Sequence, residues 1–215
     1  MKRSTEITTL FVDIGGVLLT DGWNLAASKL AAEKFNLDAK DLHKRHTQAL
    51  GAYEEGKLTL DEFLRRMVFY ERRPFTLAHF RKFMFAQSKP FPKMIGLIRR
   101  LKARYDVKIV VVSNEGRELN EYRIHTFKLD RFVDYFISSC YVGLRKPDAN
   151  IFRVALDTVR VPAKQVVYLE NTRMFVEVAE GLGIRSILHT DANSTRAKLA
   201  SLGLRDDERA IDGDR

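Results

Sequence analysis

Polar residues that could do chemistry stand directly after apolar runs at several points of this sequence. They are Asp13 after residues 10–12, Ser113 and Asn114 after residues 107–112, Glu170 and Asn171 after residues 166–169, and Lys146 in a segment that follows residues 135–138. A carboxylate nucleophile, hydroxyl and amide donors, an ammonium group and a second acid together suit the transfer of a phosphoryl group. The ammonium group and a metal ion would offset the repulsion between the nucleophile and an anionic substrate.

The apolar runs in front of these residues are what would bring them together. Each run is nearly continuous in hydrophobic residues, which is typical of buried strands in a parallel sheet. Asp13 is followed by Gly15 and Gly16, which can turn the chain and let another group approach the backbone closely. Because the carboxyl ends of parallel strands open on the same edge of a sheet, we expect all of these polar residues to converge there.

Strands and helices alternate over most of the chain. The strand-like runs lie at residues 10–12, 107–112, 135–138, 166–169 and 184–188, and segments with the periodicity of helices separate them. This alternation predicts an α/β fold with a doubly wound parallel sheet.

A long segment interrupts the alternation after the first strand. Residues 21–89 contain no run that resembles a buried strand, and their apolar residues recur at helical spacing. Thr59 followed by Glu62 is a capping box that marks the start of one of about four helices. We therefore divide the chain into an α/β core, residues 1–20 and 90–215, and a small all-helical domain inserted at residues 21–89.

Composition excludes several classes of function. The 215 residues carry 37 Lys+Arg against 28 Asp+Glu, a net charge of +9, but the acids are interleaved with the bases, which disfavours nucleic-acid binding. The single cysteine, Cys140, rules out an intramolecular disulfide and a thiolate zinc site, and we expect it to be a buried, inert thiol. No apolar run approaches the length of a membrane span or a signal peptide, so we expect a cytoplasmic protein without a membrane partner.

In the order and position of these motifs, the sequence resembles the haloacid dehalogenase (HAD) superfamily of hydrolases. The resemblance covers nearly the whole chain: the stretch at residues 13–18, then Ser113-Asn114, then Lys146-Pro147, then Glu170-Asn171 before the run at residues 178–184. It implies a Rossmann-like core with the small helical segment acting as a cap over the active site.

The resemblance also implies a role for each motif residue. Asp13 would be the nucleophile and form an aspartyl-phosphate, while Ser113 and the backbone N–H of Asn114 would hold phosphoryl oxygens. Lys146 would bind phosphate and neutralise both the nucleophile and the transferring group. The implied cofactor is Mg²⁺, bound by Asp13, the backbone carbonyl of Gly15 and Glu170, with Asn171 as a possible supporting residue behind these ligands.

Two departures from the family pattern bear on activity. Phosphatases of the family usually carry a second aspartate two residues after the nucleophile as the general acid/base, and this chain has Gly15 there. The pair on the fourth strand, usually two aspartates, is Glu170-Asn171. The residues that could replace the missing acid are Asp21, Glu115, His43 and His46.

The sequence therefore predicts a Mg²⁺-dependent hydrolase acting on a small phosphorylated metabolite. Two alternatives stay open: a catalytically weak or inactive relative that binds an anionic ligand or a protein partner, and a 2-haloacid dehalogenase. The acid at Glu170 favours the phosphatase, because dehalogenases of the family usually lack it. The sequence indicates neither the substrate nor the oligomeric state.

Overall fold

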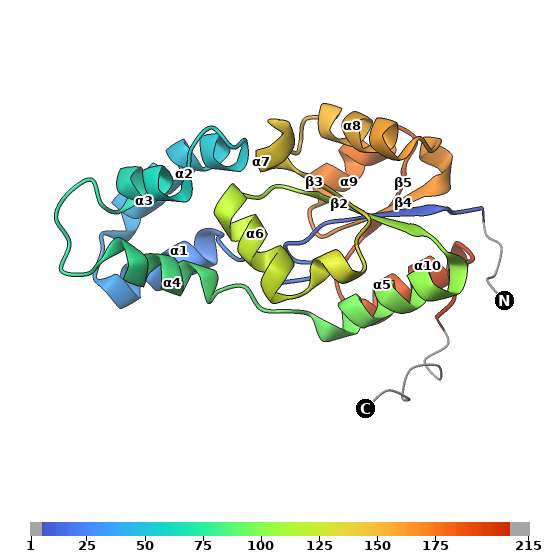
Figure 1. Ribbon diagram of the computed structural model, residues 1–215, viewed down its shortest axis with the longest axis horizontal. Helices are drawn as coiled ribbons and strands as arrows, with labels where there is room; N and C mark the ends of the chain where they lie inside the picture. Colours follow the sequence, from blue (N-terminus) through green and yellow to red (C-terminus); the bar gives the residue numbers. More distant parts are fainter. Residues whose placement is uncertain (1–5, 207–215) are drawn as a thin grey trace.

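The computed structural model describes residues 6–206 and has a five-stranded parallel sheet at its centre (Figure 1). The strands are β1 (Thr9–Val12), β2 (Lys108–Ser113), β3 (Tyr135–Ser138), β4 (Val166–Glu170) and β5 (Arg185–Leu188), in the order β3-β2-β1-β4-β5. β1 is therefore the central strand, flanked by β2 and β4. The predicted α/β fold with a doubly wound parallel sheet is confirmed.

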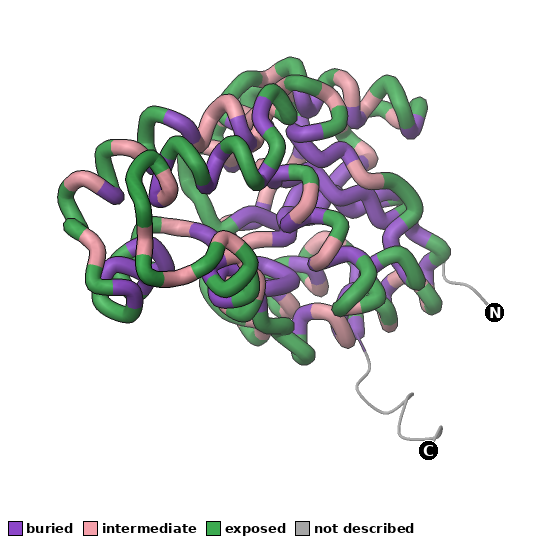
Figure 2. Tube along the Cα trace, turned by 60° about the vertical axis from the view of Figure 1, so that its left-hand side comes forward, coloured by how far each residue is buried: buried purple, intermediate pink, exposed green. Residues whose placement is uncertain are grey.

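Helices cover both faces of the sheet, and their apolar sides form two separate hydrophobic clusters with it. On one face, α5 (Pro92–Tyr105) and α10 (Ala192–Ser201) pack with alternate strand residues such as Leu10 and Val12. On the other face, α8 (Asn150–Val159) and α9 (Arg173–Glu180) pack with Phe11 and its neighbours. Burial on both faces explains why the strands are hydrophobic throughout rather than alternating; the strands form the buried centre of Figure 2.

One longer helix, one short helix and two 3₁₀ turns complete the core. They are α6 (Arg117–Thr126), α7 (Ser139–Val142) and the 3₁₀ turns Leu129–Arg131 and Ala163–Gln165. Within residues 6–206, no helix is both long enough and apolar enough to cross a membrane.

Four helices lie between β1 and α5 and form a layer beyond the carboxyl ends of the strands (Figure 1). They are α1 (Leu25–Phe35), α2 (Ala39–Glu54), α3 (Leu60–Met67) and α4 (Leu77–Phe85), and we call them the helical insertion. Their buried side chains form a third cluster, rich in aromatic rings, that includes Trp23, Phe63 and Phe80. The capping box predicted from Thr59 and Glu62 is present at the start of α3.

The helical insertion contacts the core at a second place besides its two linkers. The Ser139 hydroxyl donates to the Glu54 carbonyl (2.6 Å), and the Leu60 N–H donates to the Glu118 carboxylate (2.9 Å). The ring of Tyr53 lies against Gly116, where a Cβ atom would come within 2.0 Å of it. The insertion is thus fastened to α6 and α7 as well as to the ends of the sheet.

We expect Gly116→Ala to destabilise this contact, because the new methyl group would overlap the buried ring of Tyr53. Overpacking of this kind costs about 1–3 kcal/mol, so the free energy of unfolding in urea should fall by about that amount. Gly51→Ala is the matched control: Gly51 lies inside α2, where a Cβ would meet its nearest neighbour, Arg145 Nη1, at 3.7 Å. That substitution should leave stability unchanged or raise it by about 0.5–1 kcal/mol. Equal effects at both glycines would contradict the close packing of Tyr53 on Gly116.

Candidate active site

Asp13 lies directly after the central strand, at the carboxyl edge of the sheet. Its backbone N–H donates to the Leu169 carbonyl (3.0 Å), which continues the ladder between β1 and β4 by one residue. Its side chain is almost fully buried, and Oδ1 accepts the Ile14 N–H (2.9 Å). The sheet thus holds the carboxylate in one orientation at the point where neighbouring strands end.

Lys146 joins Asp13 to the acid at the end of β4. Its ammonium nitrogen lies 3.1 Å from Asp13 Oδ1 and 2.6 Å from Glu170 Oε2, and all three side chains are 10% exposed or less. The ammonium group also lies 5.0 Å from the centre of the Phe175 ring, on α9. The predicted convergence of Asp13, Lys146 and Glu170 is therefore present in the structure.

Tyr168 is a member of this group that the sequence did not indicate. Its hydroxyl lies 3.0 Å from Lys146 Nζ and donates to Glu170 Oε2. Burial raises the pKa of Tyr168 well above its ordinary value, and the charge of Glu170 raises it further, so the hydroxyl keeps its proton. Tyr168 and Glu170 are two residues apart on β4, so their side chains share one face of the strand. This spacing is the signal by which the sequence could have indicated Tyr168.

The two carboxylates outweigh the single ammonium group in this buried site. Burial raises the pKa of Asp13 to about 7; the charge of Lys146 opposes this shift, and the charge of Glu170 adds to it. Burial lowers the pKa of Lys146, but the charges of Asp13 and Glu170 outweigh that effect and the net shift is upward. Lys146 is therefore a permanent cation, and the site has an excess of negative charge.

Ser113 and Asn114 lie at the end of β2, next to this group. Ser113 is buried, forms a hydrogen bond to the Asp13 carboxylate that lowers the pKa of Asp13, and has its hydroxyl 3.3 Å from Glu115. The Asn114 side chain pairs with the backbone of Lys146: Oδ1 accepts the Lys146 N–H (2.8 Å) and Nδ2 donates to the Lys146 carbonyl (2.9 Å). Asn114 thereby fixes the loop that carries the lysine, a role that its position in the sequence did not indicate.

Gly15 and Gly16 form the turn after Asp13, and the two glycines differ in what surrounds them. Gly16 has a φ of +71°, and a Cβ there would lie 2.0 Å from the amide nitrogen of Asn171. Gly15 has no such strain, and a Cβ there would lie 3.5 Å from Oδ1 of Asp21. The carboxylate of Asp21 therefore occupies the space beside Gly15 that a side chain at that position would enter.

The linker that carries Asp21 is anchored by a buried ion pair. Arg123, on α6, donates to the Glu115 carboxylate (2.6 Å) and to the Thr20 carbonyl. The Asn24 amide donates to Asp21 Oδ2 (2.8 Å), which leaves Oδ1 on the side of Gly15. These contacts hold the backbone and one oxygen of Asp21 in place.

The other candidates for the missing acid lie elsewhere. Glu115 is buried in the ion pair with Arg123, and His43 is exposed on α2. His46 is buried against the rings of Trp23 and Phe63, where burial lowers its pKa to about 4 and keeps it neutral at pH 7. Cys140 is buried as expected, and burial raises its pKa to about 12, which makes it unreactive.

The side chains around Asp13 offer oxygen ligands of the kind that a hard divalent cation prefers. In the described part of the chain, no three or more His, Cys, Asp and Glu side chains gather in a metal-binding arrangement. The ligands expected from the sequence are the carboxylates of Asp13 and Glu170 and the backbone carbonyl of Gly15, with Asn171 as a possible supporting residue behind them. Glu170 Oε1 accepts one N–H, from Thr172 (2.8 Å), and the excess negative charge described above is what a cation would neutralise.

The fold and the site together define the class of doubly wound α/β enzymes that place a carboxylate at the end of the central strand. A model of the haloacid dehalogenase-like hydrolases matches residues 7–203, and the chain belongs to this family.

Relatives with assigned activities differ in length and in what they act on. The chain is 26% identical to drimenol cyclase drtB of Aspergillus calidoustus over 91% of its own length, but spans 36% of that protein, about a third. It is 23% identical to sesquiterpene phosphatase astK of Aspergillus oryzae, covering 92% of the chain and 97% of the relative. It is 27% identical to a phosphorylated carbohydrates phosphatase of Thermotoga maritima, covering 81% of each.

Solved structures share the fold at low sequence identity. A HAD family enzyme from Bacteroides thetaiotaomicron, solved as a magnesium complex, superimposes with a TM-score of 0.73 at 17% identity, over 86% of this chain and 94% of that one. The L-2-haloacid dehalogenase of Xanthobacter autotrophicus superimposes with a TM-score of 0.60 at 12% identity, over 93% and 85%. These likenesses support the fold and leave the reaction open between phosphatase and dehalogenase.

We expect Lys146→Met to destabilise the protein strongly, because it leaves Asp13 and Glu170 buried without their cation. Breaking a buried ion pair by removing one partner costs about 3–5 kcal/mol, measured as the free energy of unfolding in urea at pH 8. The double variant Lys146→Met/Glu170→Gln removes one of the two stranded charges and should recover part of the loss. A loss below about 1 kcal/mol in the single variant would contradict the assignment of Lys146 as the buried link.

Proposed function

We propose that this chain is a Mg²⁺-dependent phosphatase that hydrolyses a small phosphate monoester through a phosphorylated Asp13. The observation that carries the proposal is the position of Lys146 between the carboxylates of Asp13 and Glu170 at the edge of the sheet. A dehalogenase needs a nucleophilic carboxylate but no additional acid for a metal. The retained acid at Glu170 therefore favours the phosphatase, and two relatives of nearly matching length are named phosphatases.

In the first step, a carboxylate oxygen of Asp13 attacks phosphorus and the bond to the ester oxygen breaks. The Ser113 hydroxyl and the Asn114 N–H hold the phosphoryl oxygens, and Lys146 compensates the charge that Asp13 and the phosphoryl group share. Asp13, Glu170 and the Gly15 carbonyl would hold Mg²⁺, which would supply the further positive charge that a dianionic substrate requires in this site. Water then cleaves the acyl phosphate and restores Asp13.

Asp21 supplies the proton that the leaving oxygen needs. Of the four candidates, it is the one whose carboxyl lies beside Gly15 and Gly16, close to the turn that follows the nucleophile. The same carboxylate, once deprotonated, can accept the proton of the attacking water in the second step.

The helical insertion acts as a cap over this site. It lies beyond the strand ends where Asp13 is buried, and it is fastened to the core at its linkers and at α6 and α7 (Figure 1). A cap of this kind favours small substrates over phosphoproteins and nucleic acid, because a large substrate cannot reach the buried carboxylate.

Asp13→Asn tests the proposed nucleophile. We expect turnover of p-nitrophenyl phosphate in the presence of Mg²⁺ to fall by at least about a thousandfold, because an amide is a poor nucleophile; each tenfold loss corresponds to about 1.4 kcal/mol of barrier. The melting temperature should stay equal or rise, because burial of the Asp13 carboxylate is unfavourable. Chelation of Mg²⁺ should abolish turnover by the unmodified protein.

Three outcomes would contradict the proposal. Activity of the Asp13→Asn variant within about tenfold of the parent, or about 1.4 kcal/mol of barrier, would exclude the covalent mechanism. Turnover of 2-chloropropionate without metal, in the absence of phosphatase activity, would identify a dehalogenase. Failure to turn over either class of substrate would indicate an inactive relative.

Asp21→Asn tests the proposed proton donor through the basicity of the leaving group. A positioned acid contributes about 10²–10⁴-fold when the leaving alkoxide is strongly basic and little when it is stable. We therefore expect kcat/KM for butyl phosphate to fall by about a hundredfold or more, and that for p-nitrophenyl phosphate by less than tenfold. Gly15→Asp in the same background should restore part of the loss, since a Cβ at Gly15 meets Asp21 only at ordinary contact distance. Equal losses on both substrates would show that another group supplies the proton.

A further inference from the structure

We infer that the cleft between α1 and the linker before α5 binds an apolar chain, so that the substrate is the phosphate monoester of a hydrophobic alcohol. The inference rests on the proposed function and specifies its substrate class. One relative is named as a sesquiterpene phosphatase and another as a phosphatase of phosphorylated carbohydrates. The residues that line this cleft favour the apolar kind of substrate.

The cleft, which we call the α1 cleft, starts at the turn that follows the nucleophile. It has a volume of about 340 Å³, and its lining includes Gly16, Asp21, Ala26, Ala27, Leu30 and Phe91. Asp21 lines it at the side of Gly15, so an ester oxygen beside the Asp21 carboxyl would direct the rest of the substrate along α1. The volume is more than twice the ~150 Å³ of a cavity that accommodates benzene, which leaves room for a chain of roughly ten carbons.

The polar side chains that line the α1 cleft are already bound to other protein groups. Oδ2 of Asp21 accepts from the Asn24 amide (2.8 Å), and Oδ1 of Asn24 accepts the Ala27 N–H (3.0 Å) at the start of α1. The Gln87 amide donates to the Phe83 carbonyl (2.9 Å), and the Thr20 hydroxyl donates to the Gln87 carbonyl (2.7 Å). A sugar would have to compete with these bonds for the polar atoms that make them, whereas an apolar chain leaves them intact.

Two large exposed side chains that line the α1 cleft are apolar. Leu30 on α1 is 46% exposed and Phe91 on the opposite wall is 37% exposed, although both are large hydrophobic residues. Ala26 and Ala27 leave space between them and the linker. Covering these surfaces with a hydrocarbon chain removes apolar area from water on both partners, at about 25 cal/mol per Å².

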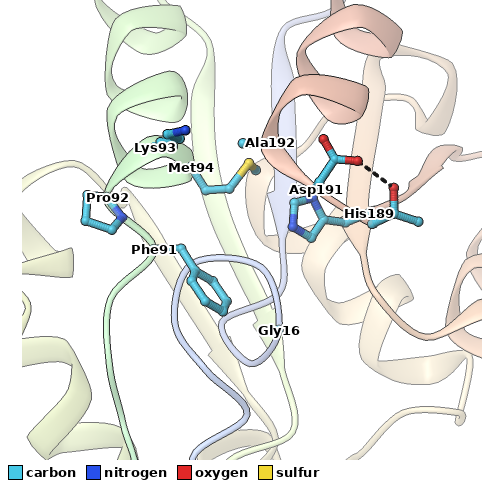
Figure 3. Close-up of a pocket in the computed structure, with 9 residues that line it drawn as sticks. Gly16, Phe91, Pro92, Lys93, Met94, His189, Asp191 and Ala192 are labelled. Atoms are coloured by element: carbon cyan, nitrogen blue, oxygen red, sulfur yellow. Dashed lines mark hydrogen bonds between the residues drawn. The ribbon is translucent and has the colours of Figure 1, made fainter.

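A second cleft adjoins the first at Gly16 and Phe91. It has a volume of about 400 Å³ and runs between the starts of α5 and α10, where Pro92, Met94 and Ala192 line it together with the polar residues Lys93, His189, Thr190 and Asp191. Figure 3 shows the Phe91 ring over the loop that carries Gly16, with the Met94 side chain above it in this view. A chain longer than the α1 cleft can continue past the Phe91 ring into this second cleft, against Pro92, Met94 and Ala192.

The linkers make the α1 cleft a preformed site. Thr20 and Lys89, in the two linkers of the helical insertion, exchange hydrogen bonds: the Thr20 N–H donates to the Lys89 carbonyl (2.9 Å) and the Lys89 N–H donates to the Thr20 hydroxyl (3.0 Å). α1 is capped by Asn24 immediately after this junction. A chain therefore binds between walls that are already in place, which limits the entropy lost on binding.

The test is a series of primary alkyl phosphates from ethyl to decyl, with glucose 6-phosphate as the polar comparison and concentrations kept below micelle formation. We expect kcat/KM to rise with chain length, by at least about a hundredfold from ethyl to decyl, because each buried methylene strengthens binding up to about fourfold. Leu30→Gln should lower the decyl-to-ethyl ratio about tenfold, through KM, and leave ethyl phosphate unaffected. Leu25→Gln is the matched control: Leu25 lies on the same helix, is 44% exposed and is absent from the lining of the α1 cleft, so its ratio should stay within twofold of the parent.

A binding measurement separates failure of this inference from failure of the proposed function. Decylphosphonate and ethylphosphonate have no ester bond to hydrolyse, and calorimetry should show tighter binding of the decyl compound with a negative heat-capacity change, lost in Leu30→Gln. That result without any turnover would support the α1 cleft and contradict the phosphatase. Turnover of p-nitrophenyl phosphate with no dependence on chain length, or with glucose 6-phosphate as the best ester, would overturn the inference and leave the phosphatase in place.

Discussion

The candidate active site depends on one buried interaction, the contact of the Lys146 ammonium group with two carboxylates. Asp13 and Glu170 stand at the ends of neighbouring strands, so the parallel register of β1 and β4 brings their like charges close together. Burial makes their repulsion costly, and it makes a fixed cation necessary for the folded state. The rest of the local structure supports that cation: Asn114 holds its backbone, and the hydroxyl of Tyr168 donates to Oε2 of Glu170, the same oxygen that contacts the ammonium group.

The sequence predicted the site residues that directly follow a strand. It did not reveal contacts between residues that lie on different helices or loops. Continuous apolar runs predicted the five strands, and the parallel topology then implied that Asp13, Ser113, Lys146 and Glu170 meet. The ion pair of Glu115 with Arg123 joins a loop to the inner side of α6, and helical periodicity alone does not reveal which polar residue a helix buries. The contact of Gly116 with a ring in the insertion was equally hidden, because nothing local shows which part of α2 faces α6.

The replacement of the usual second acid by Gly15 is compatible with catalysis because the space beside it is not empty. A carboxylate two residues after the nucleophile would be held by the strand end itself. Asp21 is held instead by the linker into the helical insertion, through Asn24 on one side and the Arg123 contact to Thr20 on the other. The position of Asp21 is thereby coupled to the position of the insertion, whereas Asp13, the proposed nucleophile, is held at the end of the sheet.

The coupling of Asp21 to the insertion bears on selectivity. The same short linker carries Asp21 at its start and leads directly into α1, whose outer face forms one wall of the α1 cleft. A substrate chain in the cleft would contact α1 and Phe91. Both belong to segments that line the same cleft as Asp21. Chain binding can therefore improve the alignment of Asp21 with the leaving oxygen, and part of the binding energy is then expressed in the rate of the chemical step rather than in affinity. Under the proposed mechanism, a poorly fitting alcohol would lose that alignment even when its phosphate group binds normally between Ser113 and Lys146.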